Sequence, residues 1–221
     1  MISAIITAAG NCTRFGREKL FSLIKGEPVF IKTVKQFLKV KAVDEVILVV
    51  RQDNRKKFEK WLKKLKIKAR LVVGGKERYD SAANGVRAAR GEYVLIHDGA
   101  RPLVTTKLIN RVIQAVLKHK AVMAGVETTT CVKVINPKTM EVIKCLERQR
   151  SWLGQTPQAF KREVILKAYE AVRQGKITGM DDCELVRKLG IKVMMIEGEW
   201  TNKKVTLPTD LEIIRKWSKY V

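Results

Sequence analysis

The clearest fold signal lies at residues 92–102, which read EYVLIHDGARP. The stretch begins with a strand-like run centred on Tyr-Val-Leu-Ile and passes directly into a polar loop. Apolar runs of the same kind occupy residues 2–8 and 45–50, as is typical of strands buried on both faces of a parallel sheet. Because helical spacing follows these runs, the alternation indicates βαβ units. We therefore predict an α/β fold built on a doubly wound, mostly parallel sheet.

The same patterns place the remaining elements. We predict strands at residues 2–8, 45–50, 71–73, 92–97, 122–126 and 192–197 and helices at 28–40, 54–66, 80–90, 105–119, 162–174, 181–189 and 209–219. Between these elements, residues 128–147 alternate apolar and polar positions around Asn136-Pro137, which indicates a two-stranded excursion. A lone hairpin is marginal in water, so we expect it to pack on a second subunit. Residues 1–221 thus form a single domain with a β-arm at about 128–150 that serves dimerisation.

The composition excludes several classes of protein. The chain has 221 residues, of which 46% are hydrophobic, too many for a disordered polycation. No apolar string approaches the roughly 18 residues that span a bilayer, and no basic region precedes the first apolar run as in a secretory signal. The four cysteines form no Cys-x-x-Cys pair, and only two histidines accompany them, which argues against a structural zinc site. We expect a cytoplasmic protein with reduced cysteines.

The charge is strongly basic, with 45 Lys+Arg against 22 Asp+Glu and a formal net charge of +23. Such a charge indicates either a polyanion such as nucleic acid or a small phosphorylated substrate. The densest basic segment, residues 51–70, carries Phe58, Trp61, Leu62 and Leu65 on one helical face. This spacing favours an outer helix whose lysines face solvent over a surface for nucleic acid or acidic lipid. We expect neither a nucleic-acid nor a membrane partner.

Three loops carry residues suited to phosphate chemistry. The first follows residues 2–8, where small residues allow backbone N–H groups close to a phosphate and Arg14 and Lys19 supply positive charge. It matches neither the P-loop nor the dinucleotide fingerprint, and a short loop with surface cations explains it equally well.

The second loop is residues 97–102. Asp98 follows a strand, where a carboxylate can hold a Mg²⁺ that bridges triphosphate oxygens, and Arg101 can fork onto a phosphate. Alternatively, Asp98 caps the following turn and pairs with Arg101. We interpret His97, which ends the strand, as a residue that orients the Asp98 loop.

The third loop is residues 74–81, GGKERYDS. Its paired glycines permit a tight turn, and Asp80 or Ser81 can cap the helix that follows. A helix N-terminus beside two glycines can read the edge of a base through main-chain contacts, although a plain turn needs no function.

Together, these segments resemble the 2-C-methyl-D-erythritol 4-phosphate cytidylyltransferase family of the non-mevalonate isoprenoid pathway. The match extends from the first strand to Thr206. It includes Ala-Ala-Gly with Arg14 and Lys19, Gly-Gly-x-Glu-Arg-x-x-Ser81, His-Asp-x-Ala-Arg-Pro, Arg148 with Thr156-Pro-Gln, and Asn202-x-Lys204-Val-Thr206.

The resemblance implies a three-layer, Rossmann-like fold of the nucleotide-diphospho-sugar transferase type, with a protruding β-arm that forms a homodimer. It also implies Mg²⁺ and a reaction between CTP and 2-C-methyl-D-erythritol 4-phosphate. The substrate phosphate attacks the α-phosphorus of CTP in line, which gives 4-diphosphocytidyl-2-C-methyl-D-erythritol and pyrophosphate. No nucleophilic side chain is needed, because fixed cations and Mg²⁺ supply most of the catalysis.

The resemblance also implies a role for individual residues. The implied catalytic residues are Arg14, Lys19, Arg148 and Lys204, with Arg148 reaching from the arm into the partner's site. The implied nucleotide-binding residues are Ala8, Ala9, Gly10, Gly75, Ser81 and Gly99. The implied substrate-binding residues are Arg101, Thr130, Cys131, Thr156, Asp181 and Thr206. Asp98 is the implied metal ligand.

The chain departs from the family pattern at a few positions. Cys12 replaces a usual glycine, Glu18 a proline, Cys131 a threonine and Met180 a threonine. The triphosphate site therefore matches better than the second-substrate site. A cytidylyltransferase for another alcohol phosphate, such as ribitol or glycerol phosphate, is the alternative. A basic nucleic-acid-binding protein, whose affinity would depend strongly on salt, is a further alternative.

Overall fold

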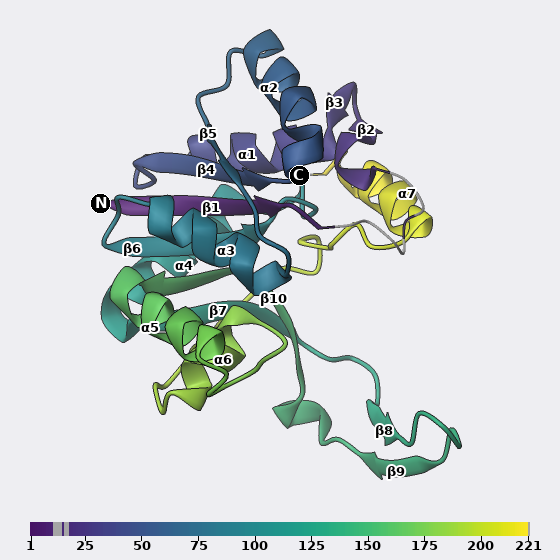
Figure 1. Cartoon of the computed structure of the whole chain (residues 1–221). Coiled ribbons are helices and arrows are strands. Elements are labelled where there is room, and N and C mark those ends of the chain that lie inside the picture. The colour runs from purple at the N-terminus through teal and green to yellow at the C-terminus, as the bar shows by residue number, and fades with distance from the viewer. Residues whose placement is uncertain (11–14, 16–17, 221) are drawn as a thin grey trace.

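A seven-stranded sheet forms the centre of the computed structural model, which describes residues 1–10, 15 and 18–220. Its strands are β1 (Ile2–Ala8), β4 (Glu45–Val50), β5 (Arg70–Val73), β6 (Tyr93–Asp98), β7 (Ala121–Glu127), β10 (Trp152–Lys161) and β11 (Met194–Glu197). They lie in the order β11-β7-β10-β6-β1-β4-β5 (Figure 1). Only β10 runs antiparallel to its neighbours among these strands, so the sheet is mostly parallel, as predicted.

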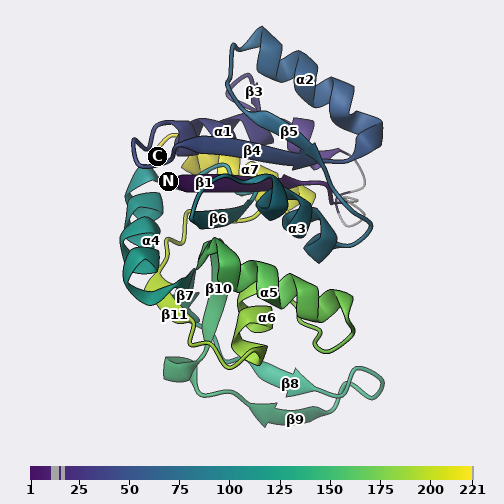
Figure 2. The same ribbon diagram turned by 60° about the vertical axis from the view of Figure 1, so that its left-hand side comes forward.

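Helices cover both faces of the sheet and make three layers (Figure 2). One face carries α1 (Val29–Leu38), α2 (Arg55–Lys64), α4 (Thr106–His119) and α7 (Pro208–Trp217), and the other carries α3 (Arg78–Ala88), α5 (Arg162–Arg173) and α6 (Asp182–Lys188). Strand β1 serves both cores, because Ile6 packs with the first set of helices and its neighbour Ile5 with the second. This arrangement confirms the predicted three-layer α/β fold.

The basic segment forms an outer helix. Phe58 and Leu62 of α2 are buried against the sheet layer, whereas the lysines of this helix are exposed to solvent. The predicted amphipathic face is therefore a core face. Of the helices in the described part of the chain, none combines the length and apolarity that crossing a bilayer requires.

Strand β10 is an element that the sequence patterns do not predict. Its centre reads Gly-Gln-Thr-Pro-Gln at residues 154–158, which lacks the apolar alternation of a strand and contains a proline. The register with β7 shifts between Gly154 and Gln158, so the irregular residues lie in a break of the ladder. Tertiary context overrides the local pattern here. The smaller elements β2 (Leu23–Ile24), β3 (Glu27–Pro28), η2 (Lys19–Phe21), η3 (Gln52–Asn54) and η4 (Arg148–Arg150) are likewise unpredicted.

The predicted β-arm is present. Strands β8 (Lys133–Ile135) and β9 (Val142–Cys145) form a separate two-stranded sheet that projects from the body between β7 and β10 (Figure 1). Val142 and Ile143 are 57% and 62% exposed, an unusual degree for apolar residues on adjacent positions of a strand. The arm therefore offers apolar surface, although its use in dimerisation stays a prediction.

Candidate active site

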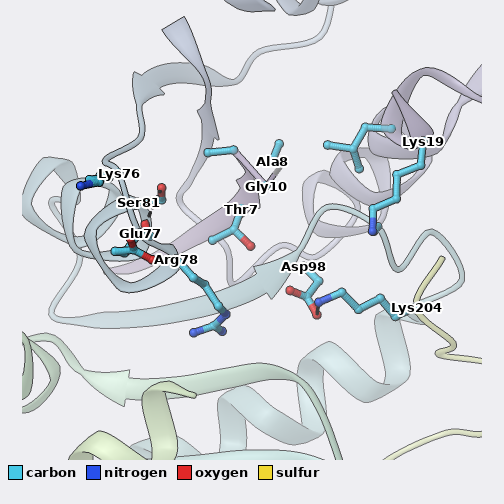
Figure 3. Close-up of a pocket in the computed structure, with 13 residues that line it drawn as sticks. Thr7, Ala8, Gly10, Lys19, Lys76, Glu77, Arg78, Ser81, Asp98 and Lys204 are labelled. Atoms are coloured by element: carbon cyan, nitrogen blue, oxygen red, sulfur yellow. Dashed lines mark hydrogen bonds and ion pairs between the residues drawn. The ribbon is translucent and has the colours of Figure 1, made fainter. Parts of the chain in front are cut away.

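A cavity of about 320 Å³ opens where β1 and β6 end and α3 begins. The carboxyl edge of a parallel sheet is the usual place for ligands in such folds. Figure 3 shows the side chains that surround this space, from all three loops singled out in the sequence. The lining comprises Thr7, Ala8, Ala9, Gly10, Lys19, Leu20, Lys76, Glu77, Arg78, Ser81, Asp98, Ala100 and Lys204.

The turn before α3 closes tightly on the end of β1. A Cβ added to Gly74 would lie 2.7 Å from the Ala9 Cβ and 2.6 Å from the Ser81 Oγ, so only glycine fits between them. Ser81 accepts from the Gly75 N–H at 3.2 Å and donates to the Glu77 carbonyl at 3.1 Å. Gly75 itself lies in this turn, next to the lining residue Lys76. The turn thus presents backbone groups beside small residues, as recognition of a nucleotide by main-chain contacts requires.

Asp98 ends β6 between two cations. Its Oδ2 atom lies 3.0 Å from the Lys204 Nζ and 3.2 Å from the Arg101 Nε. Burial alone would raise the pKa of Asp98, but Lys204, Arg101 and, more distantly, Arg78 outweigh it and hold that pKa well below its usual range. Asp98 is therefore ionised at neutral pH. Asp98 pairs with Arg101 and also faces the cavity. The two hypotheses from the sequence, a partner of Arg101 and a ligand of Mg²⁺, are therefore compatible.

The arrangement around Asp98 fits a magnesium ion. Both cations contact Oδ2, and within residues 1–10, 15 and 18–220 no side chain or backbone group donates to Oδ1. No cluster of three or more His, Cys, Asp or Glu occurs in the described residues, so a site made of protein ligands alone is not found there. Mg²⁺ typically takes one or two carboxylates together with substrate phosphates and waters. One ionised carboxylate at the cavity wall satisfies that pattern.

His97 and Thr156 hold the Asp98 loop from behind. The Thr156 Oγ1 accepts from the Asp98 N–H at 3.1 Å and lies 2.9 Å from the His97 Nδ1. Because the hydroxyl accepts from Asp98, its own proton is available to donate to Nδ1, which leaves the His97 proton on Nε2 beside the Arg101 carbonyl at 3.4 Å. This geometry agrees with the predicted orienting role of His97 and gives Thr156 a similar role.

A pH dependence of stability follows from His97. Burial is the main reason that its pKa falls from 6.5 to about 3 in the folded chain. Between these pH values the unfolded chain binds a proton that the folded chain excludes, so stability falls as pH falls. Between pH 6 and pH 4, we expect the titration of His97 to lower the free energy of unfolding by about 1 kcal/mol for each unit by which the pH falls.

Urea unfolding of the wild type and of His97→Gln at several pH values measures this slope. The variant cannot titrate and should show a flatter profile. His119→Gln, at the exposed end of α4, is the matched control and should keep the wild-type slope. Equal slopes in His97→Gln and the wild type would contradict the prediction.

The predicted catalytic lysines are both in the cavity wall. Lys19 begins the short helix η2 after the first loop, and Figure 3 shows its side chain pointing into the cavity from the opposite side to Ser81. Lys204 comes from the segment between β11 and α7 and reaches Asp98. The third predicted cation, Arg14, lies outside the described residues, as does Cys12.

Other predicted residues lie behind the cavity wall. Gly99 donates its N–H to the Thr7 carbonyl at 2.9 Å, and Arg101 donates to the Asn202 carbonyl at 2.8 Å. Thr206 donates its N–H to Asp210 at 2.9 Å, two residues beyond Lys204. Asp181 is the N-cap of α6, where it accepts from the Glu184 N–H at 2.8 Å and from Gln158 at 3.2 Å. Their contacts to a substrate stay predictions.

The predicted residues of the arm are not in this cavity. Thr130 and Cys131 precede β8, and Arg148 begins η4 after β9. None of the three lines the cavity formed by the described part of this chain. A role for them in the same site therefore requires the arm to enter another subunit.

Arg78 is the main cavity residue to which the sequence reading gave no role. Its side chain lines the cavity and donates to Asp182 at 3.0 Å. The sequence contains one local indication of its position, the Glu-x-x-Asp spacing of residues 77–80. Glu77 and Asp80 form a capping box that fixes the first turn of α3, where Arg78 lies. Its partner Asp182 lies 104 positions further along the chain, so no local sequence pattern indicates the pair.

Known proteins resemble this chain in sequence and in fold. The sequence profile described as 2-C-methyl-D-erythritol 4-phosphate cytidylyltransferase matches residues 2–216. The chain belongs to this cytidylyltransferase family. A relative of that name from Aquifex aeolicus is 38% identical over 218 residues, which cover 98% of this chain and 97% of the relative. A relative of that name from Dictyoglomus thermophilum is 36% identical over 215 residues, which cover 95% of this chain and 93% of the relative.

Solved structures of the cytidylyltransferase family have the same fold. The crystal structure of 4-diphosphocytidyl-2C-methyl-D-erythritol synthase from Anaerococcus prevotii matches with a TM-score of 0.88 at 32% identity, over 99% of this chain and 98% of that one. The cytidylyltransferase from Thermus thermophilus matches with a TM-score of 0.81 at 26% identity, over 98% of each chain. The predicted resemblance and fold class are confirmed.

Proposed function

We propose that this chain joins CTP and 2-C-methyl-D-erythritol 4-phosphate into 4-diphosphocytidyl-2-C-methyl-D-erythritol and pyrophosphate. The observation that carries the proposal is the cavity itself. The cavity brings together the glycine turn before α3, the small residues at the end of β1, and Asp98 with Lys204. The chain that forms it belongs to the cytidylyltransferase family. Relatives that are 36% and 38% identical are named as 2-C-methyl-D-erythritol 4-phosphate cytidylyltransferases, which supports this acceptor over ribitol or glycerol phosphate.

The chemistry fits the residues present. An oxygen of the acceptor phosphate attacks the α-phosphorus, the bond from that phosphorus to the bridging oxygen breaks, and pyrophosphate leaves with the bonding electrons. Both reactants are anions, so Lys19 and Lys204 lower the repulsion between them and stabilise the charge that develops on the phosphoryl oxygens. The turn at residues 74–81 holds the base, so that the α-phosphorus faces the cations.

Magnesium is part of the proposal. Asp98 would hold the ion together with phosphate oxygens of the nucleotide, and the ion would neutralise triphosphate charge. Two features of this chain support it: the depressed pKa of Asp98 and an Oδ1 atom without a donor among the described residues. Asp98 also holds the Lys204 Nζ at 3.0 Å in the cavity wall.

Pyrophosphate release tests the function. The assay offers each of the four nucleoside triphosphates with methylerythritol phosphate, ribitol phosphate or glycerol phosphate, with Mg²⁺ or with excess chelator. We expect release only from CTP with methylerythritol phosphate and Mg²⁺. Release with ribitol phosphate instead would select the alternative acceptor, and no release from CTP with any acceptor would overturn the proposal. We also propose that the enzyme works in the cytoplasm.

The second substrate site is proposed to form between two copies of the chain. Arg148 lies at the base of an arm that leads away from its own cavity, and the arm exposes Val142 and Ile143 (Figure 1). A homodimer in which each arm covers the partner's cavity would bury this apolar surface and bring the partner's arginine to the acceptor phosphate. Light scattering measures the mass of the assembly in solution. Ile143→Glu should shift the dimer towards the monomer, because it places a charge in the apolar surface of the arm.

Mixing two inactive variants tests the shared site. Arg148→Ala and Asp98→Asn should each be inactive as homodimers, but a heterodimer has one site with both residues intact. After subunit exchange, an equal mixture should recover up to about a quarter of wild-type activity, because half of the dimers are mixed and half of their sites are complete. Asp98→Asn mixed with Lys204→Ala is the control and should stay inactive, because both residues belong to one cavity. Failure of the first mixture to recover, with exchange verified by mass, would place Arg148 in its own subunit's site.

A further inference from the structure

Arg78 is held in the cavity wall by a pre-ordered helix start. It is the first residue of α3, and the capping box between Glu77 and Asp80 fixes that turn, with the Glu77 N–H donating to the Asp80 Oδ2 at 3.1 Å. Figure 3 shows the guanidinium pointing away from Ser81 and across the cavity on the side of Asp98. Its side chain remains 41% exposed, so a bound ligand can reach it.

A buried carboxylate fixes the direction of this guanidinium. Asp182, at the start of α6, has no exposed side-chain surface, and its Oδ2 accepts from the Arg78 Nη2 at 3.0 Å. Its Oδ1 accepts from the Tyr169 hydroxyl at 2.9 Å. Burial, reinforced by Asp182, raises the pKa of Tyr169 well above its usual value, so the hydroxyl stays a donor. Both oxygens of the carboxylate are used, and the aspartate can hold Arg78 in one orientation.

The pair differs electrostatically from the other cations of the cavity. Asp182 balances the charge of Arg78, whereas Asp98 alone faces both Lys204 and Arg101. Arg78 therefore adds little net charge to attract a phosphate. It still carries N–H groups: among the described residues, no protein acceptor takes the Nε or Nη1 hydrogens. These N–H groups can donate to an uncharged acceptor such as a hydroxyl.

The position along the cavity selects the group. Ser81 and the glycine turn lie at one end, where the base is proposed to bind, and Asp98 and Lys204 lie at the phosphate end. Arg78 comes from the first turn of the helix that carries Ser81, and Figure 3 shows its side chain extending from that turn towards the side of Asp98. It therefore lies between the two ends. In a nucleotide, the sugar lies between base and phosphates.

We propose that Arg78 is a specificity-determining residue that donates to a ribose hydroxyl of the bound nucleotide, and that Asp182 and Tyr169 position it. The inference rests on the proposed function for the identity of the nucleotide. The ion pair between Arg78 and the buried Asp182 links the α3 turn to α6, so α6 takes part in selecting the sugar. A deoxynucleotide would leave the guanidinium without its acceptor.

Discrimination between ribose and deoxyribose measures this role. Wild-type enzyme should prefer CTP to 2′-deoxy-CTP or to 3′-deoxy-CTP by about 10-fold or more in kcat/KM, the usual worth of a hydrogen bond from a charged group. In Arg78→Gln the preference should fall towards one, and Arg78→Lys should restore part of it. Arg87→Gln, on the same helix but outside the cavity lining, is the matched control and should keep the wild-type preference.

The positioning residues need a separate readout. Because Asp182 is buried, Asp182→Asn risks poor folding, so Tyr169→Phe is the main variant. It should lower the ribose preference several-fold, and it should have no further effect in the Arg78→Gln background, since both changes act through one guanidinium. Thermal unfolding of each variant separates this effect from loss of structure. Additive effects of the two changes would overturn the positioning role.

Binding without an acceptor separates this inference from the proposed function. Calorimetric titration of CTP and of both deoxy analogues into wild type and Arg78→Gln gives the same preference as a ratio of dissociation constants. If the wild type binds CTP but no alcohol phosphate yields pyrophosphate, the proposed function fails while the ratio still tests Arg78. Equal ratios in wild type and Arg78→Gln would overturn the inference. An effect confined to the KM of the acceptor would also overturn it, because the donor would then serve the acceptor.

Discussion

Asp98→Asn should lower kcat at least about 100-fold, and by up to about 1000-fold, in the pyrophosphate-release assay. The estimate is the usual cost of removing one preorganised electrostatic partner from an active site. Asparagine keeps the shape of the side chain but loses the charge that would hold Mg²⁺ and that keeps Lys204 and Arg101 in place. Raising the Mg²⁺ concentration should recover little of the loss, because the cations would no longer be neutralised.

The same substitution also affects the folded state. Without the carboxylate, Lys204 and Arg101 lose the negative charge between them, so the unfolding free energy should fall by about 1 to 3 kcal/mol. Urea denaturation checks that the variant is folded under assay conditions. Glu170→Gln, which removes an exposed carboxylate paired with Arg173 on α5, is the control and should leave kcat unchanged. Wild-type turnover in folded Asp98→Asn would exclude Asp98 from the reaction.

Lys19→Ala should lower kcat on the order of 100-fold with a smaller change in the KM for CTP. The lysine begins η2 and enters the cavity opposite the α3 turn, where it can meet the charge that develops during attack. A charge that is felt mainly in the transition state affects kcat more than ground-state binding.

The control for Lys19 comes from the outer helix. Lys60 of α2 is exposed and belongs to the solvent face, so Lys60→Ala changes net charge by the same amount outside the cavity. Steady-state kinetics of both variants at two salt concentrations separates a local role from long-range attraction of anions. A similar loss of kcat in both variants would mean that overall charge, not the position of Lys19, matters.

The sequence predicts most of the sheet and much of the site because the relevant signals are local. Apolar runs mark β1, β4 and β6, and parallel strands bring their carboxyl ends to one edge. The carboxyl ends of β1 and β6 therefore lie side by side, with Ala8 and Asp98 in the same cavity wall. This inference needs only the order of elements and the direction of the strands.

Contacts between distant segments could not be predicted in the same way. Strand β10 is stabilised by its two neighbours and not by its own pattern, and its Thr156 reaches His97 across 59 positions. The Arg78–Asp182 pair likewise depends on how α6 packs near α3. Asp181 likewise accepts from Gln158, 23 positions away, and this contact has no local signal; the substrate contact that the resemblance implies for Asp181 stays a prediction.

The placement of β10 also determines when the site can be assembled during synthesis. The first hundred residues contain β1, β4, β5 and β6, but Asp98 then lacks Thr156 behind it and Lys204 beside it. Domains emerge from the ribosome N-terminus first, and contacts between distant segments form late because loop closure must precede them. The Asp98 carboxylate is therefore synthesised early but acquires these partners only when nearly the whole chain is available.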